Sequence, residues 1–271
     1  MKTFNFLPEG WKHEIDNLDI PKIKDFVKNN RTLQGIVDSC DNEYNLHVNL
    51  GNGIKGIIPR QEIEELPKGE VPNIRLCLGK IHKYVQFKVK DIDNDVLFLS
   101  RKAVQKEVID TIKNDLEVGQ NLMGVVRNIK PYGAFIEIGG GVVGLAHIED
   151  LSVARIQTPY ERLKIGQKVN VVVKCIDKVT GRVNLSYKEN FGTWEENIKK
   201  FSTGMNVEGI IRETEKNKNG IFIELTPNLV GMAEYTDKYQ YGQKVNVYIK
   251  KIDNQKKKVK LLISDKKVLN Y

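Results

Sequence analysis

The strongest constraint on the fold is an apolar strand pattern that occurs three times along the chain. In residues 133–138 (GAFIEI), the period of two places Phe135 on the face opposite the alanine and the two isoleucines. Residues 220–225 (GIFIEL) repeat this arrangement, and residues 46–50 (LHVNL) give a weaker copy that carries a histidine ring. A core has no use for a ring on the outer, polar side of a strand, so we expect these rings to face solvent.

Each copy belongs to a unit of about 70 residues. Every unit opens with a strand of the Gly-Val-Val type and ends with a strand that closes on Ile-Asp, a turn and a last strand. Five strands per unit is the count that fits all three copies. A unit of this length is too short for a sandwich of two sheets but long enough for a closed five-stranded barrel. The sequence therefore predicts an all-β-dominated chain of three tandem five-stranded barrels.

Helical patterns precede and separate these units. Val104, Val108, Ile112 and Leu116 recur at steps of four residues, which is typical of one face of a helix. Pro21 suits the first turn of an N-terminal helix, which we expect to pack on the first barrel. The predicted segments are an N-terminal helical segment at 1–32, barrels at 33–102, 119–190 and 204–271, and linker helices at 103–118 and 191–203.

The charge distribution favours a polyanionic partner. The chain carries a net charge of +8, with a pI near 9.1. Lys and Arg balance Asp and Glu at 10 to 10 in residues 33–102, but exceed them by 10 to 6 in residues 119–190 and by 13 to 8 in residues 204–271. The positive charge therefore belongs to the second and third units, and nucleic acid is the commonest partner of such a surface.

The chemistry of an enzyme or a metal site is missing from the sequence. No ligand spacing relates the four histidines to one another or to the three cysteines, so no metal or other cofactor is expected. Residues 139–141 (GGG) lack the Lys-Ser/Thr of a P-loop and predict a tight turn, and no nucleophile with its base is evident. Cys40, Cys77 and Cys175 suit buried thiols in a reducing cytosol. With no signal peptide or membrane span, we expect a cytoplasmic protein.

Motifs throughout the second unit carry a family resemblance. They are GVV (124–126), PYGAF (131–135), VGLAHI (143–148), IGQKV (165–169) and GRVNLS (181–186). Together they resemble the S1 RNA-binding domain, which is named after a bacterial small-subunit ribosomal protein. The resemblance implies an OB-fold barrel that grips single-stranded RNA. Three such domains are fewer than most full-length ribosomal versions carry, so we expect a short bacterial form, either a ribosomal subunit or a paralogue.

The resemblance also assigns roles in RNA binding to five residues of the second unit. A loop aromatic, a strand aromatic, a histidine, an aspartate and a basic residue fall on Tyr132, Phe135, His147, Asp177 and Arg182. Rings of this kind stack on bases for about 1–3 kcal/mol each. Packing of the rings over the barrel mouth, a structural histidine and a turn-forming role for the aspartate are the alternatives.

The third unit keeps part of this set. Phe222 matches the strand aromatic, Asp253 the acid and Lys258 the basic residue, so these three are also predicted to bind RNA. Asn219 and Glu234 stand where the family has the loop aromatic and the histidine. We expect its grip to rest more on lysines, which meet phosphates without reading sequence.

The first unit departs further from the family. Tyr44 lies in the loop and His47 on the strand, but Pro59 replaces the histidine and Val96 the basic residue. This pattern resembles the leading repeats of the ribosomal protein, which tend to dock on the ribosome. We therefore expect weak RNA binding here and contact with a protein partner on the small ribosomal subunit.

The function expected from these observations is single-stranded RNA binding, with mRNA held at the small ribosomal subunit during translation. An accessory factor in RNA decay or transcription would use the same surface. A protein-interaction scaffold that binds no RNA is the alternative from another class, since the first unit is neutral and Glu234 replaces a histidine.

Overall fold

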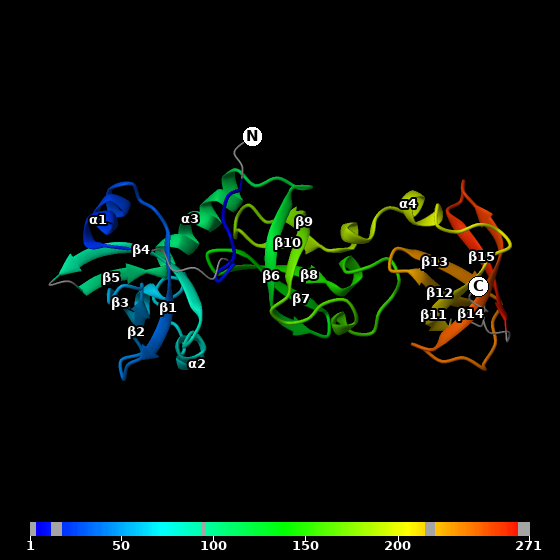
Figure 1. Ribbon diagram of the computed structural model, residues 1–271, viewed down its shortest axis with the longest axis horizontal. Helices are drawn as coiled ribbons and strands as arrows, with labels where there is room; N and C mark the ends of the chain where they lie inside the picture. Colours follow the sequence, from blue (N-terminus) through cyan, green and yellow to red (C-terminus); the bar gives the residue numbers. More distant parts are fainter. Residues whose placement is uncertain (1–3, 12–17, 94–95, 215–219, 265–271) are drawn as a thin grey trace.

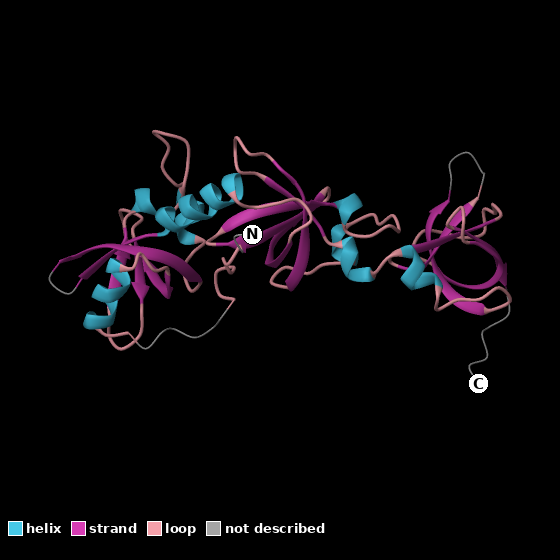
Figure 2. Ribbon diagram, turned by 90° about the horizontal axis from the view of Figure 1, so that it is seen from above, coloured by secondary structure: helices cyan, strands magenta, loops and turns pink. Residues whose placement is uncertain are grey.

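The computed structural model describes residues 4–11, 18–93, 96–214 and 220–264. The chain forms three barrels arranged in an elongated row, with the first and third at the two ends (Figures 1 and 2). Each barrel is closed and has five strands, with the first strand hydrogen-bonded to the second and fourth and the third paired in parallel with the fifth. The predicted fold class is confirmed.

The strands follow the same order in each barrel. Barrel 1 contains β1 (Leu33–Cys40), β2 (Leu46–Asn49), β3 (Lys55–Ile58), β4 (Tyr84–Asp93) and β5 (Val96–Ser100). Barrel 2 contains β6 (Asn121–Lys130), β7 (Gly133–Gly139), β8 (Val142–His147), β9 (Lys168–Ile176) and β10 (Val183–Ser186). Barrel 3 contains β11 (Asn206–Thr214), β12 (Ile221–Thr226), β13 (Leu229–Ala233), β14 (Lys244–Asp253) and β15 (Lys258–Ser264).

Short helices precede, close and connect the barrels. The α-helices are α1 (Ile20–Lys28), α2 (Ile74–Leu78), α3 (Arg101–Asn114) and α4 (Trp194–Ile198). Single 3-10 turns lie at η1 (Arg60–Glu62), η2 (Ile148–Asp150), η3 (Pro159–Glu161) and η4 (Lys188–Phe191). The Asp19 carboxylate caps α1 by accepting from the Lys22 N–H at 2.8 Å, and Ile23 of this helix is buried in the core of barrel 1, as expected.

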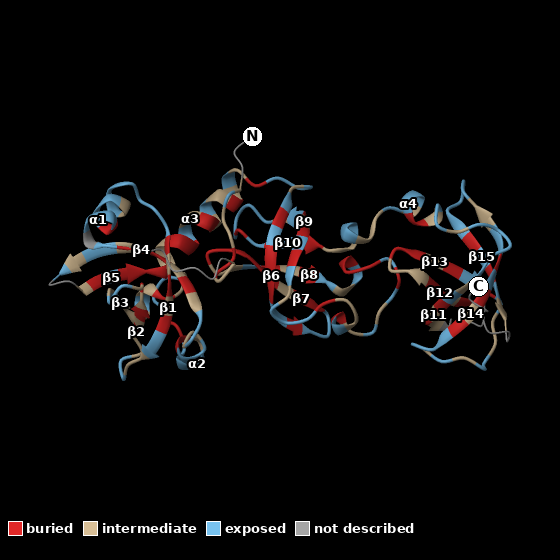
Figure 3. Cartoon of the chain, in the orientation of Figure 1, coloured by how far each residue is buried: buried red, intermediate tan, exposed pale blue. Residues whose placement is uncertain are grey.

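Each barrel has its own apolar core (Figure 3). The predicted stripe of Val104, Val108, Ile112 and Leu116 is fully buried, but it belongs to the core of barrel 2. The other side of α3 contacts β4 of barrel 1. The Ser100 hydroxyl caps α3 by accepting from the Ala103 N–H at 2.9 Å. This helix is therefore a shared wall between two barrels rather than a spacer.

The N-terminal residues 4–11 also join barrels 1 and 2 (Figure 1). Phe4 and Phe6 pack against the core of barrel 2, and the Gly10 N–H donates to the Gln34 side chain of β1 at 2.9 Å. The predicted glycine turn at 139–141 is confirmed, with positive φ at all three positions. A Cβ on Gly141 would lie 1.6 Å from Nη2 of Arg101, so only glycine fits at this position between barrels 1 and 2.

Two glutamates and one cysteine lie differently from what the pattern suggests. Glu137 and Glu224 follow the two rings on the outer face, as alternation requires, but both are buried by contacts between neighbouring parts of the chain. Among the cysteines, Cys77 is buried and Cys40 half-buried, whereas Cys175 is exposed. The expectation of a buried thiol is wrong for Cys175, because its side chain lies on the outer face of β9.

Candidate nucleic-acid interface

One row of side chains crosses the outer face of barrel 2. The strand registers pair Phe135 of β7 with Leu145 of β8, and Leu145 with Asn184 of β10. Asn128 of β6 and Cys175 of β9 extend the row at its two ends. All five side chains lie outside the barrel because their neighbours in the strands fill the core.

Two aromatic rings meet near the Asn128 end of this row. Tyr132 is 50% exposed, and its ring packs edge-to-face on the half-buried ring of Phe135, with centroids 6.1 Å apart and planes at 81°. Gly133 between them allows the close approach of β7 to β8, because a Cβ there would lie 2.4 Å from the Ala146 carbonyl oxygen. The pair leaves ring surface open to a planar ligand such as a base.

His147 lies beside the rings, on the neighbouring strand. It pairs with Gly133, which makes it a diagonal neighbour of Phe135, with side chains about 7–8 Å apart. The imidazole is 46% exposed, and its Nδ1 is 3.8 Å from a carboxylate oxygen of Glu149. The structure therefore brings Tyr132, Phe135 and His147 together, as predicted from the sequence.

Asp177 and Arg182 lie at the opposite end of the row, where β9 turns into β10. The Asp177 carboxylate accepts bonds from the N–H groups of Val179 and Thr180 at 2.9 and 3.1 Å, and from the Thr180 hydroxyl at 2.6 Å. These bonds, the hydroxyl's first, hold the pKa of Asp177 below its usual range. The aspartate thus builds the turn, and Arg182 beside it is exposed.

The corresponding row of barrel 3 runs through Glu213, Phe222, Met232, Lys260 and Lys251. Phe222 takes the place of Phe135 and is half-buried, and Met232 next to it is exposed.

The turn of barrel 3 repeats that of barrel 2. Asp253 pairs with Lys258 across it and accepts from the Lys256 N–H at 2.9 Å. Glu234 is exposed, as its position on the outer face requires. The expected loop position, Asn219, lies outside the described residues.

Barrel 1 has the same row with different occupants, namely Ser39, His47, Ile57, Phe98 and Asp91. Its loop tyrosine and its strand histidine are engaged within the barrel. His47 Nε2 lies 3.3 Å from the Asp41 carboxylate, and the guanidinium of Arg60 lies 5.0 Å from the centre of the Tyr44 ring.

Phe98 is the outer-face aromatic of barrel 1 that the sequence reasoning missed. It is 37% exposed and belongs to β5, the last strand, rather than to β2. The alternation of Val96-Leu97-Phe98-Leu99 was the available signal, because it sends Leu97 and Leu99 inward and Phe98 outward.

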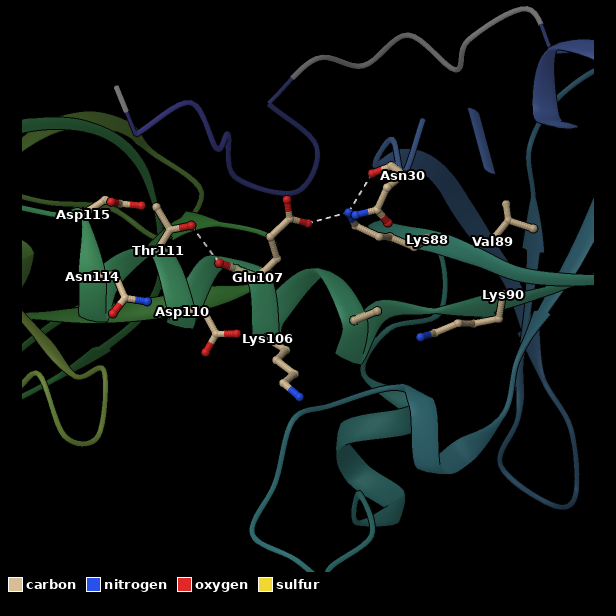
Figure 4. A pocket seen from close by; sticks show the side chains of 11 residues that line it. Asn30, Lys88, Val89, Lys90, Lys106, Glu107, Asp110, Thr111, Asn114 and Asp115 are labelled. Carbon is tan, nitrogen blue, oxygen red and sulfur yellow. Dashed lines mark hydrogen bonds and ion pairs between the residues drawn. The ribbon is translucent and has the colours of Figure 1, made fainter. Parts of the chain in front are cut away.

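A hollow of about 540 Å³ lies away from these rows, between β4 and α3 (Figure 4). Lys88 Nζ lies on its wall, 2.5 Å from the Glu107 carboxylate, and donates to the Asn30 carbonyl at 2.7 Å. Three lysines and three acidic residues line it in all, including Lys106 and Asp110. Because these charges offset one another, we interpret the hollow as part of the contact between α3 and barrel 1 and not as a ligand site.

Neither a metal cluster nor a membrane span is found in the part of the chain that the structure describes. Among those residues, no three His, Cys, Asp or Glu side chains gather closely enough to hold a metal ion. None of the described helices is long and apolar enough to cross a membrane.

The chain is similar to a known domain family and to known ribosomal proteins. The S1 RNA binding domain model matches residues 27–102 and 115–188. Small ribosomal subunit protein bS1 of Staphylococcus aureus strain MRSA252 is 37% identical over 197 residues, which is 66% of this chain and 50% of that protein. The bS1 protein of Staphylococcus epidermidis is 35% identical over 197 residues, with the same coverage.

One solved structure is similar to a smaller part of the chain. GSP13 from Bacillus subtilis is 29% identical, with a TM-score of 0.28, and covers 29% of this chain and 61% of its own. The chain spans about half the length of the curated relatives it matches. The two stretches that match the family model include barrels 1 and 2 and make up more than half of the chain. This protein therefore belongs to the S1 RNA-binding domain family.

Proposed function

We propose that barrels 2 and 3 bind single-stranded RNA on their outer rows, and that the RNA is mRNA held near the small ribosomal subunit. The observation that carries this proposal is the open ring pair of Tyr132 and Phe135 beside His147. Arg182 at one end of the row supplies a charge for phosphate, and the row of barrel 3 adds Phe222 and Lys260. The names of the bS1 relatives support a place on the ribosome.

Barrel 1 is assigned a different role within this proposal. Its loop tyrosine and strand histidine are already engaged by Arg60 and Asp41, and its net charge is zero. A neutral surface of this kind suits a protein partner on the small subunit better than RNA. The role of the whole chain is binding rather than catalysis, and its proposed location is the cytoplasm.

Fluorescence anisotropy of a labelled single-stranded RNA tests the proposal. The Phe135→Ala/Phe222→Ala variant should lose affinity by more than about tenfold, because each stacked base contributes about 1–3 kcal/mol. Its salt dependence should stay unchanged, since the rings release no counterions. The matched control is His47→Ala/Phe98→Ala in barrel 1, which should bind like the intact protein.

Equal binding by the intact protein and the ring variant would contradict the proposal and favour a scaffold that uses the barrels without RNA. Co-sedimentation with small ribosomal subunits tests the second part. The intact protein should sediment with the subunits, and its absence from that fraction would contradict the ribosomal setting.

A further inference from the structure

A second hollow, of about 680 Å³, lies between barrels 1 and 2. We call it the junction groove. One wall comes from barrel 1, where Arg75 of α2 and Lys83 before β4 line it. The other wall comes from barrel 2 and includes Val143 of β8 and Lys168 of β9. Both neighbouring barrels therefore contribute charged side chains to one hollow.

The carboxylates of the groove are already engaged by cations. Arg101 Nε lies 2.6 Å from the Glu9 carboxylate, and its Nη1 lies 2.6 Å from that of Glu64. Arg127 Nε lies 2.5 Å from the Glu137 carboxylate. Glu9, Glu64 and Glu137 are the acidic residues of the groove lining. All three are therefore paired with arginines that stabilise the junction.

The cations on the groove surface are left over after this pairing. Arg75 and Lys83 are exposed, and within the described residues neither of them pairs with a carboxylate. Lys168 Nζ donates to the carbonyl of Trp11 at 2.8 Å, a neutral partner that leaves its charge uncompensated. The groove thus presents unmatched positive charge from both of its walls, unlike the seam beside α3.

The groove lies alongside the RNA row of barrel 2, next to β6, β7 and β8. Val143 lines it and lies on the outer face of β8, two residues before Leu145 of the row. The parallel register that pairs Asn184 with Leu145 puts Arg182 at the level of Val143. A strand that leaves the rings along β8 therefore reaches the groove at Val143.

We propose that the junction groove binds the sugar-phosphate backbone of the same RNA strand whose bases stack on Tyr132 and Phe135. This inference rests on the proposed function and extends it. A basic groove that follows the backbone next to a stacking platform is how single strands are held without sequence reading. The Glu9–Arg101 pair fixes the walls relative to each other, so little ordering is needed when the strand binds.

The test compares RNA lengths in two variants that lose the same charge. Arg75→Gln/Lys83→Gln removes two cations from the groove. Lys24→Gln/Lys28→Gln removes two exposed cations from α1 and serves as the control. Labelled oligouridylates of about 6 and about 16 nucleotides span the range of sites on such barrels. All four side chains are exposed, and matching melting temperatures would show that both variants fold.

For the short RNA, both variants should bind like the intact protein. For the long RNA, the groove variant should have a salt slope smaller by about 1.4, which corresponds to about 10–25-fold weaker binding near 0.1 M salt. The control should keep the slope of the intact protein. Long-RNA binding that is the same in groove variant and control would overturn the inference.

Two further outcomes separate this inference from the proposed function. If Phe135→Ala leaves short-RNA binding unchanged, the proposed function fails at the rings and the inference fails with it. If short-RNA binding needs Phe135 but the groove variant behaves like the control, only the groove inference is overturned. Binding of a polyglutamate peptide that the groove variant loses, with no change in RNA binding, would assign the groove to an acidic protein segment instead.

Discussion

Barrels 1 and 2 place the same five positions on their outer faces but leave different groups available there. In barrel 2 the rings of Tyr132 and Phe135 pack on each other and keep open surface. In barrel 1 the ring of Tyr44 lies under Arg60, and His47 is held by Asp41. The fold therefore fixes which positions face a ligand. Contacts with neighbouring side chains decide whether the residues at these positions are available to bind it.

A second difference lies two residues further along the same strands. Barrels 2 and 3 carry an Arg–Glu pair with a buried carboxylate there, Arg127–Glu137 and Arg212–Glu224. Barrel 1 has Asn49 at this position, and its amide oxygen accepts from the Gly51 N–H at 2.9 Å. In each of these barrels the pair contacts a segment that comes earlier in the chain. The pair of barrel 2 contacts Glu9, and the pair of barrel 3 contacts Glu161 and Arg162.

Breaking the pair in barrel 3 should give the largest effect. Glu224 contacts both Arg212 and Arg162, so Glu224→Leu leaves two buried guanidinium groups without it and should cost about 3–5 kcal/mol. Trp194 packs against the core of barrel 3, and its fluorescence in a Trp11→Phe background reports unfolding there. The matched Asn49→Ala change in barrel 1 should cost about 1 kcal/mol. Equal costs would remove the distinction between the barrels.

The next effect concerns the rings. Phe135→Ala alone should weaken RNA binding by about 5–150-fold, because one stacked base is worth about 1–3 kcal/mol. His47→Ala, at the same position of barrel 1, should leave binding unchanged. Anisotropy titrations of both variants with RNA test this prediction. A larger loss of RNA affinity for His47→Ala than for Phe135→Ala would contradict the difference between the two barrels.

Acid should loosen the junction between barrels 1 and 2 by a smaller amount, because titration removes only the difference between folded and unfolded pKa values. Burial alone would raise the pKa of Glu9, but Arg101 and Lys80 outweigh burial and lower it below its ordinary 4.5. The contribution of the ionised Glu9 carboxylate to stability is therefore complete above pH 4.5. It is lost as the pH falls through the lowered pKa of Glu9.

Glu137 acts in the opposite sense, since burial and the charge of Glu9 raise its pKa despite Arg127. Its neutral form is favoured in the folded protein, and that contribution is lost as pH rises through the raised pKa. Trp11 fluorescence in a Trp194→Phe background follows this junction. The stability gap between the intact protein and Glu9→Gln should close on acidification, and a gap that stays constant from pH 7 to about 3 would contradict the account.

The smallest effect concerns the tyrosine of barrel 1. It tests whether this barrel fails to bind RNA because Arg60 covers the Tyr44 ring. Arg60→Gln removes the cation over the Tyr44 ring, a contact worth about 0.5–1 kcal/mol at an exposed site. In a Phe135→Ala/Phe222→Ala background, RNA binding should rise by at most about fivefold. No gain at all would mean that Arg60 is not what keeps this ring from RNA.

The sequence predicted features that depend on local periodicity. Alternation placed Phe135 and Phe222 on the outer faces, and steps of four residues placed Val104 and Val108 on the buried side of a helix. The five-stranded barrels followed from unit length and strand count, and the register that brings His147 next to the rings followed the family motif.

Features that depend on contacts between distant segments were not predictable in this way. Glu137 is buried because the Glu9 N–H, 128 residues away, donates to its carboxylate at 2.6 Å. No local pattern signals such a contact, and the same holds for the Arg162–Glu224 pair at the next junction. The junction groove arises from these contacts, so it too is visible only in three dimensions.

The central claim is that Phe135 and Phe222 are open to RNA in barrels 2 and 3, whereas Tyr44 and His47 of barrel 1 are engaged by Arg60 and Asp41. Ultraviolet crosslinking of a single-stranded RNA to the intact protein, followed by mass spectrometry of the peptides, tests it most directly. The account predicts crosslinks at Tyr132, Phe135 and Phe222 and none at Tyr44 or His47. Crosslinks concentrated at Tyr44 and His47, with the rings of barrel 2 untouched, would contradict it.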